Sequence, residues 1–288
     1  MMPDKNWLPH VKAFRYFVSL AKQPACLLTG FCRAVGKPKR PIAPLDFGCA
    51  SQVPLDSVLP AGTLQVAARL THWVCENAKS TRAYLARVAA LYPLAAPLQQ
   101  QHLTELPRAV HKKGDHGAQG MAAFDARALL APALAGHDLG LVSEAGMPAV
   151  ADPGSSVVRA AHVLGVPVCP LVGPVSLLLA LAASGLNGQN FAFTGYLPQD
   201  ASARAQRIRA LEATALQSGQ TQLFIETPYR NTALWQALLQ TLQPRTRLAL
   251  ASGLTLPEAR IACKTVADWR RDPSPPEPRT PTVFGIGV

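Results

Sequence analysis

The sequence predicts an α/β protein of two domains behind a basic N-terminal extension. Its 288 residues are many for one average domain and sufficient for two. A hydrophobic content of 49% against a charged content of 16% supplies a sizeable core and argues against wholesale disorder. From about residue 51, short apolar runs alternate with stretches of helical period, which favours parallel or mixed sheets with helices on both faces. We assign the extension to 1–50, an N-terminal domain to 51–172 and a C-terminal domain to 173–288.

The extension differs from the rest of the chain in charge. Residues 1–50 carry eight Lys and Arg against two Asp, a net charge of +6, whereas 51–288 carry twenty against fifteen acids, a net charge of +5. The segment has no clean signal-peptide core or cleavage site. We interpret it as a disordered extension or as residues added by a wrongly assigned start. The mildly basic body is compatible with an anionic partner such as RNA, and equally with simple solubility.

The elements of the N-terminal domain follow from periodicity and punctuation. Serine or threonine precedes two of the helices, so Ser80 or Thr81 and Ser155 or Ser156 are expected as N-caps. Residues 111–120 are expected to form a polar, glycine-rich loop. The expected helices are 62–70, 80–91, 124–137 and 155–165, and the expected strands are 72–77, 138–146 and 166–174.

The C-terminal domain repeats the alternation with different contents. Residues 175–185 are almost wholly apolar, so this helix is expected to be buried. The other expected helices are 202–216, 231–242 and 264–271, and the expected extended segments are 189–198, 221–228, 246–255 and 280–288.

Several classes of site are absent from the sequence. The six cysteines form no CxxC pair, so we expect reduced, mostly buried thiols in a cytosolic protein and neither disulfides nor a zinc site. No clustered His and Cys spacing indicates a metal, and no GxxxxGK[ST], GxGxxG after a strand, or GxSxG is present. The longest apolar run is broken by Pro170, Gly173 and Pro174, so no membrane span is expected.

Three expected strands end in loops of the same kind. The loops read SEAGMPAVADPG (143–154), LVGPVS (171–176) and IETPYR (225–230), and each turns sharply at Gly or Pro. In open α/β sheets, ligands bind at the carboxyl ends of strands, where glycines let them approach the backbone. The loops therefore predict one cleft suited to an adenine or an amino-acid moiety.

The order of these motifs resembles the tetrapyrrole methylase superfamily. The first loop, the turn at 173–174, the run FAFTGYLP and the strand end LFIETPYR are similar to it in order and spacing, and the branch most similar is that of the small-subunit ribosomal RNA ribose 2′-O-methyltransferases. The resemblance implies two α/β domains, a cleft between them that holds S-adenosylmethionine as in class III methyltransferases, a homodimer, and ribosomal RNA as substrate. In that family an apolar strand precedes the first helix. Residues 47–53 do not predict one, so the first strand and its loop are expected to be missing or replaced.

The resemblance also implies roles for individual residues. The positions expected to line the cofactor cleft are Ser143, Glu144, Ala145, Gly146, Pro148, Gly173, Pro174, Ser176, Glu226 and Thr227.

A ribose hydroxyl must lose its proton during methyl transfer, so a base is expected near the cleft. Candidate catalytic residues are Glu76, His102 and Glu105, and candidate RNA contacts are Lys79, Arg82 and Arg230. Each also has a structural interpretation, as a helix cap, a packed histidine or a solvated charge. Two other functions stay open: methylation of a tetrapyrrole or other small molecule, and a non-catalytic cofactor- or RNA-binding homologue with a degenerate first loop.

Overall fold

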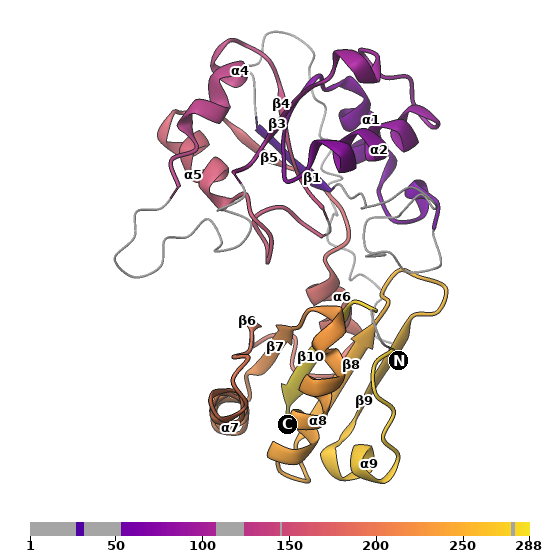
Figure 1. The fold of residues 1–288 in the computed structure, drawn as a ribbon, viewed down its shortest axis with the longest axis vertical. Helices are drawn as coiled ribbons and strands as arrows, with labels where there is room; N and C mark the ends of the chain where they lie inside the picture. The colour runs from indigo at the N-terminus through magenta and orange to yellow at the C-terminus, as the bar shows by residue number, and fades with distance from the viewer. Residues whose placement is uncertain (1–26, 32–52, 108–123, 145, 278–279) are drawn as a thin grey trace, which may run out of the picture.

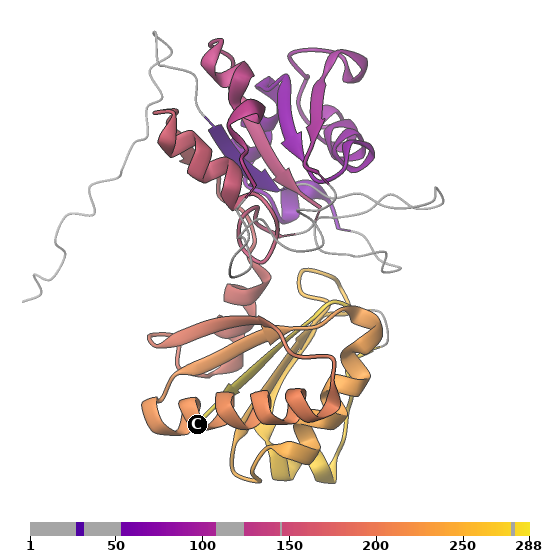
Figure 2. The same cartoon turned by 60° about the vertical axis from the view of Figure 1, so that its left-hand side comes forward.

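The computed structural model describes residues 27–31, 53–107, 124–144, 146–277 and 280–288. Two α/β domains follow each other along the long axis, and the first sheet lies above the second (Figure 1). The same separation is visible after rotation (Figure 2). Most of 1–50 and the predicted loop at 111–120 lie outside the described residues.

The first sheet has five strands in the order β3-β2-β4-β1-β5, and its neighbouring strands pair in parallel. Parallel pairing directs all five carboxyl ends to one edge of the sheet. The strands are β1 (Leu27–Phe31), β2 (His72–Cys75), β3 (His102–Glu105), β4 (Leu139–Ser143) and β5 (Val168–Pro170).

Strand β1 corrects the interpretation of the N-terminal segment. It lies within residues 1–50, yet it pairs in parallel with both β4 and β5. The expectation that the first strand is missing is therefore wrong, and part of the supposed extension belongs to the first domain. The short run LLTGF sits in a basic segment, and its partners lie more than a hundred residues away, so no local pattern identifies it.

Helices cover both faces of the first sheet, as predicted. Trp73 and Val142 face a core shared with α1 and α2, whereas Val74 and Leu141 face a core shared with α5. This alternation is the period of two expected of a strand buried on both sides. The elements are α1 (Ala61–Arg69), α2 (Ala78–Ala89), α4 (Ala131–Leu134) and α5 (Ser155–Val163), with short 3₁₀ turns at Leu55–Ser57, Leu98–Gln100 and Arg127–Leu130.

Both predicted N-caps of this domain are displaced. Helix α2 is capped by Asn77, whose side chain accepts from the backbone N–H groups of Lys79 (2.9 Å) and Ser80 (3.2 Å). Helix α5 begins after Gly154, which has a φ of 136°. Asn77 lies three residues before Ser80, and Gly154 lies one residue before Ser155. The sequence pattern alone does not determine a helix end to the residue.

The second sheet is mixed and has the order β6-β7-β10-β8-β9. Strands β6 and β7 are parallel, and the remaining neighbours are antiparallel. Consequently the carboxyl ends of β7 and β8 lie beside the amino end of β10. The strands are β6 (Phe191–Tyr196), β7 (Thr221–Ile225), β8 (Arg247–Ser252), β9 (Arg260–Thr265) and β10 (Thr282–Gly287).

One face of the second sheet is covered by α6 and the other by three helices. The predicted burial of α6 is only partly right: Leu177 and Leu181 are buried, but Leu178 is 50% exposed and Leu179 38% exposed. An apolar helix can lie on a sheet with its outer side uncovered. The helices are α6 (Ser176–Ser184), α7 (Ala201–Ser218), α8 (Asn231–Thr241) and α9 (Val266–Arg271), with a 3₁₀ turn at Pro228–Arg230.

The connection between the two sheets runs from β5 to α6. Thr63 of α1 donates a hydrogen bond of 2.7 Å to the carbonyl of Val172, which ties this connection to the first domain. Helix α6 then packs on the second sheet. We propose residues 171–175 as the domain boundary.

The cysteines among the described residues differ in exposure. Cys75 is buried, Cys263 is half-buried and Cys169 is exposed, all three as free thiols. The expectation of buried thiols is thus wrong for Cys169, which lies on the exposed edge strand β5. Burial raises the pKa of the Cys75 thiol to about 11, which keeps it protonated and unreactive.

Gly140 of β4 is required by the Trp73 ring on the neighbouring strand. The two residues are paired in register, and a Cβ on Gly140 would lie 2.3 Å from Trp73 Cε3. We expect Gly140→Ala to lower the free energy of unfolding by about 1–3 kcal/mol through overpacking, measured by urea unfolding.

Gly62→Ala is the matched control, because a Cβ at this position in α1 meets no atom within 4 Å. It should be neutral or stabilising. Equal destabilisation by both substitutions would contradict the packing argument.

Candidate functional site

The three strand-end loops meet in one cavity between the two sheets. Its empty volume is about 930 Å³ including the mouth, and its wall is mostly apolar. The lining residues are Gly146, Met147, Val150, Ala151 and Asp152 from the first loop; Val175 and Ser176 from the second, with Leu177 just after it; Ile225, Glu226, Thr227 and Pro228 from the third; and Tyr196, Ala251, Leu254, Pro281, Thr282 and Val283 from the second sheet and its loops.

The loop after β4 has an unusual backbone. Gly146 has a φ of 82°, and two alanines, Ala149 and Ala151, have φ values of 65° and 64°. Left-handed conformations cost non-glycine residues about 1–2 kcal/mol each. Such strain concentrates at functional sites, where the surrounding structure maintains it.

Hydrogen bonds from the neighbouring strand hold the start of this loop. The backbone N–H of Glu144 donates to Glu76 Oε2, which follows β2, and the Ser80 hydroxyl of α2 donates to the Glu144 carboxylate. Glu76 and Glu144 thus serve first to fix the loop against the end of β2 and the first turn of α2.

Asp152 is the most strongly perturbed carboxyl of the cavity. Burial raises its pKa to about 8, and the nearby carboxylates of Glu76 and Glu144 add to the shift, while a hydrogen bond with Ser143 opposes it. At neutral pH, Asp152 is therefore largely protonated. A carboxyl that titrates near pH 8 in a cavity is suited to moving a proton.

The opposite wall carries a buried ion pair. Glu226 Oε1 accepts from the Thr227 N–H (2.7 Å) and from Arg230 Nη2 (2.8 Å) and Nε (3.0 Å). The Glu226 side chain is only 3% exposed. The predicted RNA contact Arg230 therefore neutralises Glu226 and does not extend a free guanidinium into solvent.

The predicted cleft residues divide into two groups. The cavity wall includes Gly146, Ser176, Glu226 and Thr227, and Ala145 lies outside the described residues. The remaining predictions adjoin the cavity in sequence without lining it: Ser143, Glu144, Pro148, Gly173 and Pro174.

Of the predicted catalytic residues, Glu76 and Glu105 lie at the adjoining ends of β2 and β3, whereas His102 lies apart from them. Glu76 lies beside the cavity loop, and Glu105 at the end of β3 accepts from the Ala78 N–H at 2.6 Å, which caps α2. His102 begins β3, at the amino edge of the parallel sheet, whereas the cavity lies at the carboxyl edge. Its ring stacks on His72 with centroids 4.6 Å apart. The prediction that His102 acts at the cavity is therefore wrong, because this residue lies at the other end of the strand.

The other predicted RNA contacts remain exposed. Lys79 and Arg82 lie on the outer side of α2, whose first turn binds the cavity loop through Ser80. Both cations therefore lie on the helix that contacts the start of the loop after β4.

The sequence analysis did not predict Asp152 and Tyr196 as site residues, although Asp152 lies in SEAGMPAVADPG and Tyr196 in FAFTGYLP. Burial raises the pKa of the Tyr196 hydroxyl, and the Asp152 and Glu226 carboxylates add to this. The sequence pattern of residues 281–283 does not predict a place in the site. These residues reach the cavity because the order of the strands brings the start of β10 beside the end of β7.

Two negative findings hold for the described part of the chain. No group of three or more His, Cys, Asp or Glu there is arranged to bind a metal ion. Within the same residues, no helix has the length and apolarity needed to span a membrane.

The geometry agrees with the match to a known family. The family model described as "Tetrapyrrole (Corrin/Porphyrin) Methylases" matches residues 68–269, which is 202 of the 288 residues. The chain belongs to the tetrapyrrole methylase family. This match spans all three loops of the cavity and the predicted RNA contacts.

Curated relatives of this tetrapyrrole methylase carry the name "Ribosomal RNA small subunit methyltransferase I". The protein from Pseudomonas aeruginosa is 40% identical over 95 residues, 33% of this chain and 32% of the relative. The one from Vibrio cholerae is 36% identical over 141 residues (49% and 46%), and the one from Mesorhizobium japonicum is 29% identical over 218 residues (76% and 66%). The chain thus spans between about a third and two thirds of the length of these relatives.

Solved structures of methyltransferases also align with the chain. The methyltransferase CobJ is 20% identical, with a TM-score of 0.49 over 81% of this chain and 89% of that one. Uroporphyrin-III-C-methyltransferase from Thermus thermophilus is 19% identical, with a TM-score of 0.43 over 79% and 86%.

The raised pKa of Asp152 has a consequence for stability. A carboxyl whose pKa rises from 3.8 in the unfolded chain to about 8 in the folded one binds its proton more tightly when folded. Its contribution is complete below about pH 4 and is lost as the pH rises to about 8. The free energy of unfolding of the wild type should therefore fall between about pH 4 and pH 8, a decrease that we call the falling limb. We expect Asp152→Asn to remove it, so that the variant gains stability relative to the wild type between pH 5 and 8 in urea titrations.

Asp125→Asn is the control, since that carboxyl is exposed and paired with Arg127, which lowers its pKa to about 2. This variant should keep the falling limb. A wild type without the limb, or an Asp152→Asn variant that retains it, would contradict the burial of a protonated carboxyl.

Proposed function

We propose that this tetrapyrrole methylase family member is an S-adenosylmethionine-dependent methyltransferase that acts on small-subunit ribosomal RNA, at a ribose 2′-hydroxyl. The observation that carries the proposal is the convergence of three strand-end loops on one cavity. The names of the curated relatives support the choice of ribosomal RNA.

The lining of the cavity offers both apolar surface and polar groups to such a cofactor. Leu177, Leu254 and Val283 supply apolar surface for a nucleoside ring. Gly146 has no Cβ and a positive φ, so a ligand can approach its backbone. The cofactor carries an ammonium group, and the carboxyl oxygens of Asp152 and Glu226 on the wall can accept hydrogen bonds from it.

The chain's own residues would orient the reaction. When bound, S-adenosylmethionine supplies an electrophilic methyl group. Gly146, Ser176 and Thr227 would hold the nucleoside and amino-acid parts, and the apolar wall would exclude water, so that much of the rate comes from positioning.

We propose Asp152 as the group that removes the proton from the acceptor hydroxyl. Its carboxyl lines the cavity, and its pKa of about 8 makes its ionised form a stronger base than an ordinary carboxylate. Glu76 and Ser143 act on Asp152 through charge and hydrogen bonding, so they are positioning residues in this scheme.

Lys79 and Arg82 are proposed to contact RNA phosphates at the mouth of the cavity. Both are exposed on α2, and α2 is bonded directly to the cavity loop. Arginine and lysine on such a rim would fix the register of the RNA without reading its sequence.

We also propose that the protein forms a homodimer and lies in the cytoplasm. Leu178 and Leu179 of α6 and Val172 beside it are exposed, and their apolar side chains suit the predicted homodimer. We propose the cytoplasm as location, because a ribosomal RNA substrate would be found there.

The test is tritium transfer from labelled S-adenosylmethionine to small ribosomal subunits of a strain that lacks its own enzyme of this kind. We expect transfer to RNA, with a rate that rises with pH and levels off above about pH 8 as Asp152 ionises. Asp152→Asn should lower the rate about 10²–10⁴-fold and abolish this rise, whereas Asp125→Asn should not.

Label that appears in a tetrapyrrole and never in RNA would replace the substrate assignment. Cofactor binding without any transfer would support the non-catalytic alternative.

A further inference from the structure

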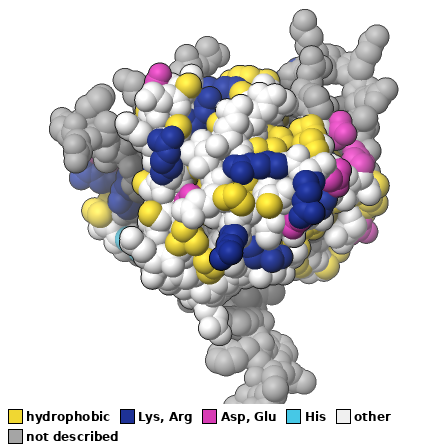
Figure 3. Space-filling view, turned by 90° about the horizontal axis from the view of Figure 1, so that it is seen from below, with side chains coloured by type: hydrophobic (Ala, Val, Ile, Leu, Met, Phe, Trp, Pro, Cys, Tyr) yellow, Lys and Arg dark blue, Asp and Glu magenta, His cyan; other side chains and the backbone are white. Residues whose placement is uncertain are grey.

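The C-terminal domain carries a group of cations at the end that faces away from the first domain. Figure 3 looks at this end from below and shows several groups of Lys and Arg side chains spread across it, with Asp and Glu gathered toward one side. We define the distal basic surface as Arg209, Arg245, Arg247, Lys264, Arg270 and Arg271.

The turn between α8 and β8 is the centre of this surface, and it is fixed on both sides. The buried Glu212 of α7 accepts from the backbone N–H of Gln243 at 2.8 Å and from the hydroxyl of Thr246 at 2.5 Å. On the other side, the N–H groups of Val266 and Ala267 donate to the carbonyls of Thr246 and Pro244, both at 2.9 Å. The backbone of the turn is therefore held in a defined place.

Three arginines around this turn are exposed. Arg209 lies one helical turn before Glu212, and Arg245 and Arg247 lie within and just after the turn. In the part of the chain that the structure describes, none of the three forms an ion pair with a carboxylate. Their charges are available to a partner.

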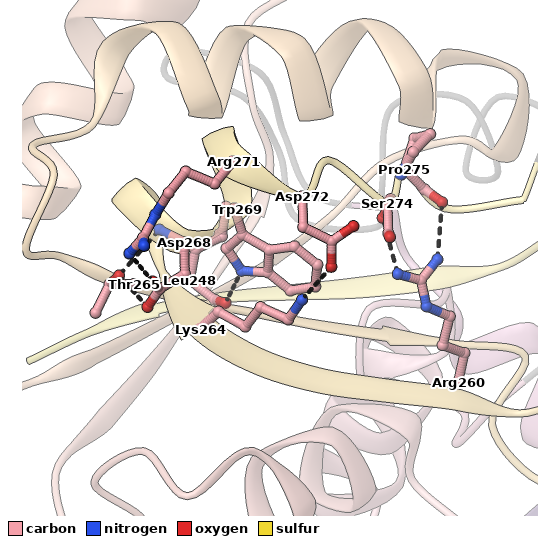
Figure 4. Close-up of polar contacts among 10 residues, drawn as sticks. All are labelled: Leu248, Arg260, Lys264, Thr265, Asp268, Trp269, Arg271, Asp272, Ser274 and Pro275. Atoms are coloured by element: carbon pink, nitrogen blue, oxygen red, sulfur yellow. Dashed lines mark hydrogen bonds and ion pairs between the residues drawn. The ribbon is translucent and has the colours of Figure 1, made fainter.

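The carboxylates of this end are already occupied. Lys264 Nζ lies 2.8 Å from Asp272, and Arg271 donates to Asp268, as Figure 4 shows. Arg247 shares one shallow hollow with Lys264 and Arg271. The six cations outnumber the carboxylates Asp268, Asp272 and Glu212, which leaves an excess of +3.

The surface is remote from the cavity. Arg247 begins β8, and Ala251 near its other end lines the cavity. Four residues of strand span about 14 Å, so the surface and the cavity lie at opposite ends of β8.

The side chains of the surface suit phosphates and not bases. The exposed aromatic residues among those described are Phe191, Tyr196 and Tyr229, and none belongs to this surface, whereas Trp269 beneath it is buried. Without aromatic platforms, bases have nothing to stack on. Arginine forks match phosphate oxygens instead.

We propose that the distal basic surface docks the phosphate backbone of RNA, as a second contact remote from the methyl-transfer cavity. The choice of RNA as the polyanion rests on the proposed function. Such a contact would be independent of sequence and sensitive to salt, because each neutralised phosphate releases counterions.

The test compares the full chain with a double variant, Arg245→Ala with Arg247→Ala. The probes are a fluorescently labelled fragment of small-subunit ribosomal RNA and an unrelated RNA hairpin of equal length, titrated by anisotropy between 50 and 200 mM salt. Removing two phosphate contacts should reduce the slope of log K against log salt by about 1.5–2 for both probes.

Arg69→Ala with Arg127→Ala is the control, since it removes two exposed arginines from the first domain. This pair should leave the slope unchanged. Unfolding curves check that both double variants are folded.

A double variant with the salt slope of the wild type overturns the proposal, even if methyl transfer to RNA is normal. The same holds if its only loss is in binding an acidic polypeptide such as polyglutamate, which would assign the surface to a protein partner. Failure of the methyltransferase assignment is read separately, from cofactor binding without RNA.

Discussion

The loop after β4 is anchored at its start by a hydrogen bond from the backbone N–H of Glu144 to the Glu76 carboxylate. This bond joins the ends of two neighbouring parallel strands, and the Ser80 hydroxyl reinforces it from α2. Because the loop is held at its start, Gly146, Ala149 and Ala151 can keep their left-handed conformations. The cavity wall follows from that constraint.

The same arrangement explains the chemistry of Asp152. The loop carries its carboxyl into a partly enclosed space beside two other carboxylates, and burial together with their charge opposes ionisation. On the facing wall, Glu226 is neutralised by Arg230 and a backbone N–H. One wall thus presents a carboxyl that titrates near neutrality, and the other a fixed ion pair.

The sequence was sufficient for most elements and for the convergence of the loops, because buried strands ending in Gly and Pro are local patterns. The sequence did not predict the strands whose formation depends on pairing with residues far away in the chain. Strand β1 finds β4 and β5 only in the folded chain, and β3 is an edge strand with exposed His102 and Glu105 that shows no alternation. Strand β9, with mostly half-buried residues, was missed for a similar reason. The distance of His102 from the cavity, and the pairing of Arg230 with Glu226, likewise depend on which strand ends meet.

Calorimetry with S-adenosylmethionine tests most directly whether these loops bind the cofactor. The full chain is compared with Gly146→Val and with Gly136→Val, which shares a positive φ (93° against 82°) but has no atom near its Cβ. At Gly146 an added Cβ lies 3.3 Å from Asp152 Oδ2, inside the cavity. Binding heat should be present in the wild type and Gly136→Val and lost in Gly146→Val, with both variants folded. A wild type without heat at millimolar cofactor, or a Gly146→Val variant that binds as well as the wild type, would contradict the account.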